Sequence, residues 1–269
     1  MIRIGCSGWS YEHWRGLIYP RCSSARWLEL YAQSFDTVEV NATFYRLPTL
    51  KSVEGWAART PDDFVFTVKA SRYLTHIRRL RDLGDGMARM DACVEPLRRA
   101  GKLAAVLWQL PPQFARDDDV LVSALASLPP GRHAFEFRDP SWFALEVYEI
   151  LRDHQVALVV ADRAPGEPSP HVETASWSYM RFHVGRGSDG NYSAQQLQEW
   201  AIRIRSQPGD VLAYFNNDWQ GFAIANARTM RRLVSDAPSS SSRTSGACRA
   251  GSDSQRQMGP QGMPASYLT

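Results

Sequence analysis

The sequence predicts a (β/α)8 barrel, in which a parallel sheet closes on itself and helices surround it. Eight short apolar runs recur roughly every 30 residues, which matches the length of a strand and helix unit. Segments with the three- and four-residue apolar spacing of helices lie between them. Alternating strands and helices form parallel sheets, and eight units in about 235 residues favour a closed barrel over an open, doubly wound sheet.

The eight predicted strands are these short apolar runs. They begin near Ile2, Thr37, Phe64, Leu103, Ala134, Ala157, Ser178 and Val211. Most of the runs end on one charged or amide residue, such as Asn41 after the second run and Lys69 at the end of the third. Unpaired buried charges are costly, so polar groups gathered at strand ends are either paired with one another or functional.

The predicted helices lie between the strands. They cover Ala25 to Phe35, Leu50 to Ala58, Asp85 to Ala100, Asp118 to Leu128, Ala144 to His154, Ala194 to Ser206 and Ala223 to Val234. Leu121, Leu125 and Leu128 show the helical spacing. Ser193 stands where a capping residue would begin the helix at Ala194.

The character of the chain changes near Asp236. Pro238 is followed by four serines and then by a mixture of Gly, Ser, Arg, Gln and Pro without periodicity. Polar segments of low complexity cannot bury enough apolar surface to fold. We therefore predict one barrel domain over residues 1–235 and a disordered tail over residues 236–269.

Composition predicts a globular, cytoplasmic protein. The apolar fraction is 44%, and the net charge of +3 is far from that of a dedicated nucleic-acid-binding tail. The four cysteines lie far apart and form no zinc or disulfide motif, which is typical of a reducing compartment. The chain begins without the regions of a signal peptide, and no stretch approaches the ~20 apolar residues of a membrane span, so no membrane partner is expected.

Strand alternation selects the polar residues that share one face. Glu136 and Arg138 share a face of the fifth strand, and Arg181 and His183 share a face of the seventh. Active sites of this fold lie at the carboxyl ends of the strands. We therefore predict one ring of polar residues at this mouth, made of Glu39, Asn41, Lys69, Gln109, Glu136, Arg138, Asp162, Arg181, His183 and Asn216.

Two carboxylates that face each other across the mouth could act as general acid and base. Glu39 and Glu136 are the preferred catalytic pair, and Asp162 is the reserve carboxylate. Lys69 could serve as a point charge or, if desolvated, as an amine nucleophile. His183 could be an acid, a base or a metal ligand.

Alternatively, the ring is a structural network of ion pairs. Glu136 would then pair with Arg138 or Lys69, and Asp162 with Arg181.

Other groups near the mouth are predicted to bind a substrate. Arg138 and Arg181 offer planar donor forks for a carboxylate or phosphate. The further predicted substrate-binding residues are Trp9, Asn41, Tyr45, His76, Gln109, Trp142, Asn216 and Asn217. The aromatic rings could stack on sugars or bases, or they could form a hydrophobic lid. Tyr73 lies beside Arg72, Arg78, Arg79 and Arg81, which form either a polyanion-binding edge or a solvated helix face.

No cofactor is predicted, but a divalent metal is an alternative. The oxygen and nitrogen ligands for Mg²⁺, Mn²⁺ or Zn²⁺ would come from Glu39, Glu136, Asp162, His183 and Asp218. The chain contains no local metal signature such as His-Glu-x-x-His, and the positive charges near the mouth could balance the carboxylates instead.

The order of several motifs resembles that of a known family. The motifs are Gly5-Cys-Ser-Gly-Trp-Ser-Tyr11, Val38-Glu-Val-Asn41, Gln109-Leu-Pro-Pro112, Phe135-Glu-Phe-Arg138, Arg181-Phe-His183 and Tyr214-Phe-Asn-Asn-Asp218. From residue 1 to about 234 the chain resembles the YecE-like proteins, also known as domain of unknown function seventy-two. The resemblance implies a TIM barrel and no particular reaction. The chain departs from the pattern at Val184, where a glycine often follows the histidine, and in its serine-rich tail.

Two classes of function fit these observations. The first hypothesis is an enzyme that uses acid and base chemistry, as in hydrolysis or elimination, on a small anionic substrate of phosphorylated or sugar-like type. A metal-dependent, nuclease-like phosphodiesterase is the alternative within the enzyme class. The second class is a non-catalytic module that binds a nucleotide or nucleic acid.

Overall fold

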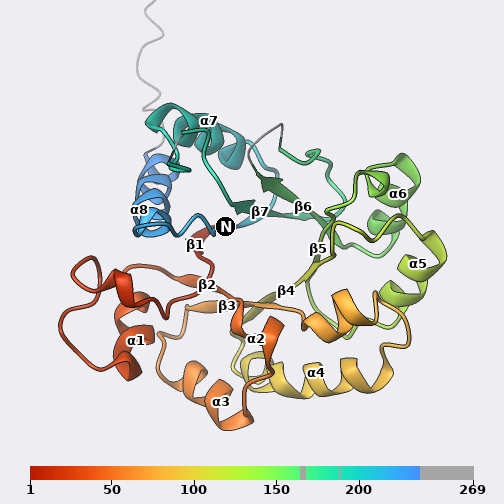
Figure 1. The fold of residues 1–269 in the computed structure, drawn as a ribbon, viewed down its shortest axis with the longest axis horizontal. Helices are drawn as coiled ribbons and strands as arrows, with labels where there is room; N and C mark the ends of the chain where they lie inside the picture. The colour runs from red at the N-terminus through yellow and green to blue at the C-terminus, as the bar shows by residue number, and fades with distance from the viewer. Residues whose placement is uncertain (164–167, 188, 237–269) are drawn as a thin grey trace, which may run out of the picture. The chain divides into compact units, whose positions relative to one another are not determined.

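The computed structural model describes residues 1–163, 168–187 and 189–236, within which eight strands form one parallel sheet. The strands are β1 (Ile2–Cys6), β2 (Thr37–Val40), β3 (Val65–Lys69), β4 (Leu103–Gln109), β5 (His133–Glu136), β6 (Ala157–Asp162), β7 (Trp177–Phe182) and β8 (Asp210–Phe215). Each strand from β2 to β7 pairs with the next one along the chain, and β8 pairs with β1. This order makes a nearly closed barrel and confirms the predicted fold class (Figure 1).

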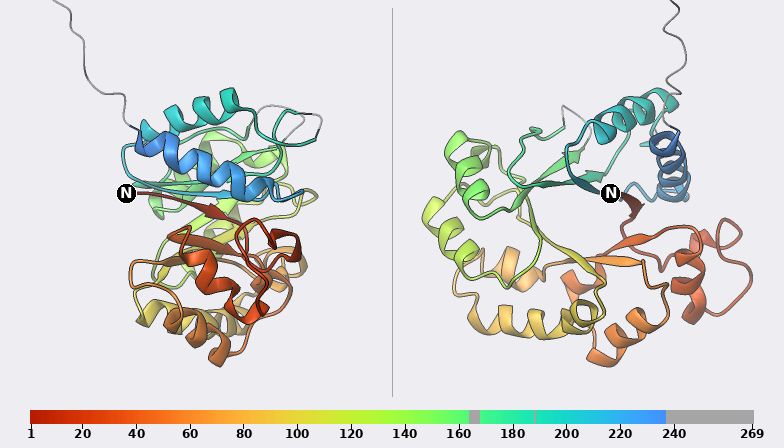
Figure 2. Two further views of the ribbon diagram at one scale, coloured as in Figure 1. Left: turned by 90° about the vertical axis from the view of Figure 1, so that its left-hand side faces the viewer. Right: turned by 180° about the vertical axis from the view of Figure 1, so that it is seen from behind.

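Helices lie around the outside of the sheet, as Figure 1 and both views of Figure 2 show. They are α1 (Trp27–Ala32), α2 (Ala42–Tyr45), α3 (Leu50–Ala58), α4 (Gly84–Arg99), α5 (Asp118–Ala126), α6 (Leu145–Asp153), α7 (Ala194–Arg205) and α8 (Phe222–Ser235). The predicted cap of α7 is confirmed, because Ser193 and Gln196 form a reciprocal capping box. The short helix α2 and a π-helix at Tyr73–Ile77 were not expected, because single turns leave no periodic signal.

Tyr31 closes the seam between β1 and β2. Its hydroxyl accepts a hydrogen bond from the Cys6 amide at 2.8 Å and donates one to the Thr37 carbonyl oxygen at 3.0 Å. A side chain at Gly5 would place its Cβ 2.2 Å from that carbonyl oxygen, so the close approach requires glycine. A backbone bridge between Ser7 and Glu39 follows, and it brings Glu39 to the mouth of the barrel.

Two apolar layers stabilise the barrel. The outer layer lies between sheet and helices and includes Phe66, Trp108 and Phe182, while the inner layer lies in the lumen and includes Leu107 and Leu212. Full burial of one such side chain contributes about 1.5–3 kcal/mol to folding. The middle of the lumen is mainly apolar, and its hydroxyl groups at Thr37, Thr67 and Tyr214 hydrogen bond to one another.

The predicted tail lies outside the described residues, except for Asp236 at the end of α8. In the described part of the chain, every helix is too short or too polar to cross a bilayer.

Candidate functional site

Polar side chains from six strands meet at the carboxyl end of the barrel. We call them the mouth cluster, and its members are Glu39, Lys69, Gln109, Glu136, Arg138, Arg181, His183 and Asn216. Strand alternation places them, because residues adjacent to them in sequence, such as Val38, Phe135 and Phe182, pack outward in the layer beneath the helices. The structure therefore brings together most of the ring that alternation selects from the sequence.

Arg181 lies at the centre of the mouth cluster. Its Nε and Nη2 donate hydrogen bonds to the two carboxylate oxygens of Glu39 at 2.9 and 2.7 Å, and its Nη1 donates to Glu136 Oε2. The guanidinium is 1% exposed. Bidentate contacts of this kind fix both position and orientation. Because its donors are used, Arg181 holds the two glutamates in place rather than presenting a free anion-binding fork.

Glu39 is fully buried, and each of its oxygens accepts two hydrogen bonds. In addition to Arg181, Ser7 Oγ donates to Oε1 at 2.6 Å and the Tyr179 hydroxyl donates to Oε2 at 2.7 Å. Burial raises the pKa of Glu39, but the charge and hydrogen bonds of Arg181 outweigh burial and leave this pKa below its ordinary value. Glu39 is thus ionised and has no lone pair left for a substrate.

Glu136 lies close to both arginines and to the histidine of the mouth cluster. Its Oε1 lies 2.6 Å from Arg138 Nη2 and 3.4 Å from His183 Nε2. Burial opposes ionisation here too, but the charge of Arg181 outweighs it and holds the pKa of Glu136 well below its usual range. Both glutamates are therefore ionised at neutral pH, and neither is the protonated acid that an acid and base pair requires.

His183 lies between an amide and two guanidinium groups. Its Nδ1 is 3.1 Å from Asn216 Nδ2, and its Nε2 is 3.5 Å from terminal nitrogens of Arg138 and Arg181. Burial lowers the pKa of His183, although Glu136 opposes this effect. The imidazole is therefore neutral near pH 7.

Lys69 is the half-buried cation of the mouth cluster. Its Nζ donates a hydrogen bond to Gln109 Oε1 at 2.9 Å and lies 4.2 Å from the centre of the Phe44 ring. Burial lowers the pKa of Lys69 to about 8, and the charge of Arg181 adds to the effect. Across the described residues, Lys69 forms no ion pair with a carboxylate. Its amine is therefore poised to lose a proton near neutral pH.

The mouth carries a surplus of positive charge. The two ionised glutamates are balanced by the two arginines that contact them. Lys69 adds one further positive charge, and Arg163, which follows β6, adds another. Burial lowers the pKa of Arg138, and the positive charge of Arg163 contributes to this effect. The site is electrostatically suited to an anion.

Three predicted site residues lie away from the mouth cluster. Asp162 points outward from β6 and accepts a hydrogen bond from Trp200 Nε1 at 2.9 Å, so its predicted pairing with Arg181 is wrong. Trp142 is fully buried and stacks on Phe137 at 4.7 Å. Trp9 packs edge-on against Trp56 of α3 at 5.3 Å. The two tryptophans hold loops onto the helical layer.

The other predicted binding residues lie near the rim. Tyr45 is 81% exposed. Asn41 Oδ1 is buried, as are both side-chain polar atoms of Asn217, and none of these atoms has a hydrogen-bond partner among the described residues. His76 packs edge-on against Phe44 at 4.9 Å, and burial together with the charge of Lys69 lowers its pKa to about 4. His76 is thus a neutral side chain close to Lys69.

Sequence reasoning missed three residues of this region. Ser7 and Tyr179 hold Glu39, and Arg163 adds charge. Strand alternation could have identified Tyr179, because it stands two residues before Arg181 and so lies on the same face of β7. No sequence pattern identifies Ser7, because its position near Glu39 follows from the closure of the barrel.

In residues 1–163, 168–187 and 189–236, no group of three or more His, Cys, Asp or Glu side chains is arranged to hold a metal ion.

Comparisons with known proteins identify relatives of the whole barrel. The family model described as "Protein of unknown function DUF72" matches residues 3–247. The UPF0759 protein YunF of Bacillus subtilis (strain 168) is 30% identical over 274 residues, which cover 87% of this chain and 95% of YunF. The UPF0759 protein YecE of Escherichia coli (strain K12) is 34% identical over 181 residues, 64% of each chain.

Solved structures show the same architecture. A DUF72 family protein from Thermotoga maritima superposes with a TM-score of 0.78 and 29% identity, covering 88% of this chain and 100% of the other. One from Enterococcus faecalis V583 superposes with a TM-score of 0.73 and 22% identity, covering 88% and 96%. At that lower identity the likeness concerns the fold alone.

Proposed function

The chain belongs to the DUF72 family of proteins of unknown function, and from its mouth cluster we propose that it is an enzyme that performs acid and base chemistry on a small anionic substrate. Lys69 is the main proton-transferring group, and His183 is the second. Arg138 binds the anionic group of the substrate, which is a phosphorylated or sugar-like compound.

The observation that carries this proposal is the placement of the Lys69 amine between Gln109 and the Phe44 ring, where it is largely removed from water. An ordinary lysine has a pKa of about 10.4 and is almost fully charged at neutral pH. Burial lowers the pKa of Lys69 to about 8, close to the working range in which a proton-transferring group is most effective. Gln109 holds the amine at 2.9 Å, so its position is fixed as well.

An anionic substrate follows from Arg138. Its side chain is 21% exposed, so part of it is open to solvent. Its Nη2 contacts Glu136, whereas its buried Nε has no hydrogen-bond partner in the described part of the chain. An unused guanidinium donor in a site with surplus positive charge favours a carboxylate or phosphate group.

The two glutamates take a different role from the one expected from the sequence. Because both are ionised and bonded to Arg181, they do not exchange protons with a substrate in this proposal. Glu39 fixes Arg181, and Glu136 orients Arg138 and His183. They are positioning residues.

A ligand screen followed by kinetics tests the proposal. Phosphosugars and other anionic metabolites are tested for a rise in Tm, because a ligand that binds the native state stabilises it. Turnover of a stabilising compound is then compared for Lys69→Met and for Lys51→Met, which alters an exposed lysine of α3.

Lys69→Met is expected to lose about 100-fold or more in turnover, the typical contribution of general acid and base catalysis, whereas Lys51→Met should match the wild type. Wild-type turnover should rise with pH through about 8, because the base is the neutral amine. Full activity of Lys69→Met would refute the assigned role.

A further inference from the structure

A cavity lies beside the mouth, between the loops that follow β2 and β3. Its volume is about 330 Å³. This volume falls in the range of small-ligand sites. Three arginines and two tyrosines contribute to its lining: Arg46, Arg72, Arg89, Tyr45 and Tyr73. Phe44 also lines it, and the centre of its ring lies 4.2 Å from Lys69 Nζ, so the cavity adjoins the mouth cluster at this ring.

The three arginines of the cavity come from separate segments of the chain. Arg46 follows α2, Arg72 precedes the π-helix, and Arg89 lies in α4. All three are exposed, and none of them pairs with a carboxylate in the described ranges. Three unpaired guanidinium groups around one small cavity attract a phosphate, which accepts their donors in bidentate fashion.

Neighbouring arginines differ in this respect. Arg78 pairs with Asp82, and Arg81 pairs with Asp117 at 2.7 Å. The run of arginines in the sequence is therefore partly neutralised. Of the two members without a carboxylate partner among the described residues, Arg72 lines the cavity and Arg79 lies over the Phe114 ring.

The tyrosines at the cavity present exposed aromatic faces. Tyr45 is 81% exposed and Tyr73 is 42% exposed. Large exposed rings are costly to leave in water, and they stack readily on planar bases. Guanidinium groups and open rings around one cavity match a ligand that joins a phosphate to an aromatic base.

The backbone around Tyr73 is unusual in a way that supports a binding role. The segment from Tyr73 to Ile77 is a π-helix, and Arg79, Leu80 and Asp82 have φ angles of +47°, +65° and +47°. π-helical turns and left-handed non-glycine residues are energetically unfavourable and cluster at functional sites. A Cβ at Gly86 would lie 2.9 Å from Tyr73 Cε1, so this glycine allows α4 to support the ring closely.

We propose that this cavity binds a nucleotide, with Arg46, Arg72 and Arg89 around the phosphate and Tyr45 and Tyr73 against the base. The same chemistry occurs in a free nucleoside monophosphate and at a nucleotide of a single strand. The inference goes beyond the proposed function, and neither depends on the other, because different side chains carry them.

Isothermal titration calorimetry with the full chain tests the site. The probes are adenosine monophosphate, adenosine, inorganic phosphate and a single-stranded tetranucleotide. Arg72→Ala and Arg89→Ala are each expected to weaken binding of adenosine monophosphate about tenfold, the size of one charge-assisted hydrogen bond. Tyr45→Ala should weaken it about tenfold through lost stacking. Arg232→Ala, an exposed arginine of α8, is the matched control and should bind as the wild type does.

The two sources of the ligand give different rankings. Tighter binding of the tetranucleotide than of the monophosphate, with the same dependence on Arg72, assigns the cavity to a strand, and the reverse order assigns it to a free nucleotide. Either order supports the proposal. The proposal is overturned if neither adenosine monophosphate nor the tetranucleotide binds, or if inorganic phosphate binds as tightly as adenosine monophosphate. It is also overturned if Arg232→Ala weakens binding as much as Arg72→Ala does.

Discussion

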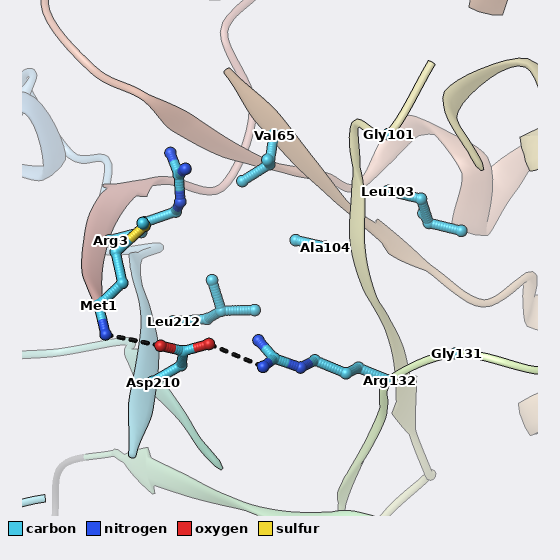
Figure 3. Close-up of a pocket in the computed structure, with 10 residues that line it drawn as sticks. All are labelled: Met1, Arg3, Val65, Gly101, Leu103, Ala104, Gly131, Arg132, Asp210 and Leu212. Carbon is cyan, nitrogen blue, oxygen red and sulfur yellow. Dashed lines mark hydrogen bonds and ion pairs between the residues drawn. The ribbon is translucent and has the colours of Figure 1, made fainter. Parts of the chain in front are cut away.

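The two ends of the barrel carry arginine and carboxylate pairs of equal length in different surroundings. At the amino end, Arg132 contacts Asp210 at 2.7 Å beside a cavity of about 410 Å³, and the Met1 amine contacts the other oxygen of Asp210 (Figure 3). At the carboxyl end, Arg181 contacts Glu39 at 2.7 Å. The amino-end side chains are 43% and 35% exposed, against 1% and 0% at the carboxyl end.

The two ion pairs have the same length but contribute differently to the free energy of unfolding. Water screens an exposed ion pair, which typically contributes about 0–1 kcal/mol. A buried pair gains more attraction but must offset the loss of hydration, so removing one partner leaves a costly isolated charge. The carboxyl end should thus be sensitive to single substitutions and the amino end tolerant of them.

The largest effect is expected for Arg181→Met. The substitution leaves Glu39 and Glu136 buried without their central cation, which should lower the free energy of unfolding by about 3–5 kcal/mol. Arg132→Met, the matched change at the amino end, should cost less than about 1 kcal/mol. Urea denaturation of both variants measures the difference.

A fold too unstable to measure still leaves this prediction testable. Combining Arg181→Met with Glu39→Gln and Glu136→Gln removes the isolated charges and should restore part of the stability. Equal losses for Arg181→Met and Arg132→Met would contradict the contrast between the two ends.

The second-largest effect is expected on stability at acidic pH. The pKa values of Glu39 and Glu136 are lower in the folded chain than in the unfolded one, where they are about 4.3. Their contribution to stability is therefore fully present above that value and is lost as the pH falls through the folded pKa values. The free energy of unfolding should decrease below about pH 4, and less steeply in Glu136→Gln than in the wild type. If the free energy of unfolding fell equally steeply with pH in both proteins, the ionised state of Glu136 would not contribute to stability as predicted.

A smaller effect is expected for Tyr179→Phe. This substitution removes one donor from the ionised, fully buried Glu39, and hydrogen bonds to charged groups contribute about 1.5–3 kcal/mol. Tyr148→Phe is the control, since the structure shows no hydrogen bond from the hydroxyl of Tyr148 to any described residue. Urea denaturation should show a lower free energy of unfolding for Tyr179→Phe and almost no change for Tyr148→Phe. Similar losses in the two variants would contradict a stabilising hydrogen bond from Tyr179 to Glu39.

The fold and much of the mouth could be predicted from the sequence because strand spacing and side-chain alternation are local properties. Alternation placed Glu136 with Arg138 and Arg181 with His183, and the structure confirms both placements. Asp162 escaped this reasoning because β6 is buried on both faces and reads as apolar throughout, so no residue marks its inward side.

Other features of the molecule depend on contacts between distant segments. That both glutamates are ionised follows from their shared contact with Arg181, which no single strand reveals. The cavity beside the mouth likewise combines arginines from three segments with a π-helix. Alternation identifies which side chains face the lumen, but it does not reveal how their charges balance.

The most direct test of the proposed chemistry is the titration of Lys69. The sequence contains three lysines, Lys51, Lys69 and Lys102, so their side-chain signals can be resolved by ¹³C-detected NMR and the Lys69 signal assigned by its loss in Lys69→Met. A midpoint near pH 8 is expected for Lys69, because burial at the barrel mouth disfavours its charged form. A midpoint near the ordinary value of about 10.4 would contradict the assignment of Lys69 as the proton-transferring group.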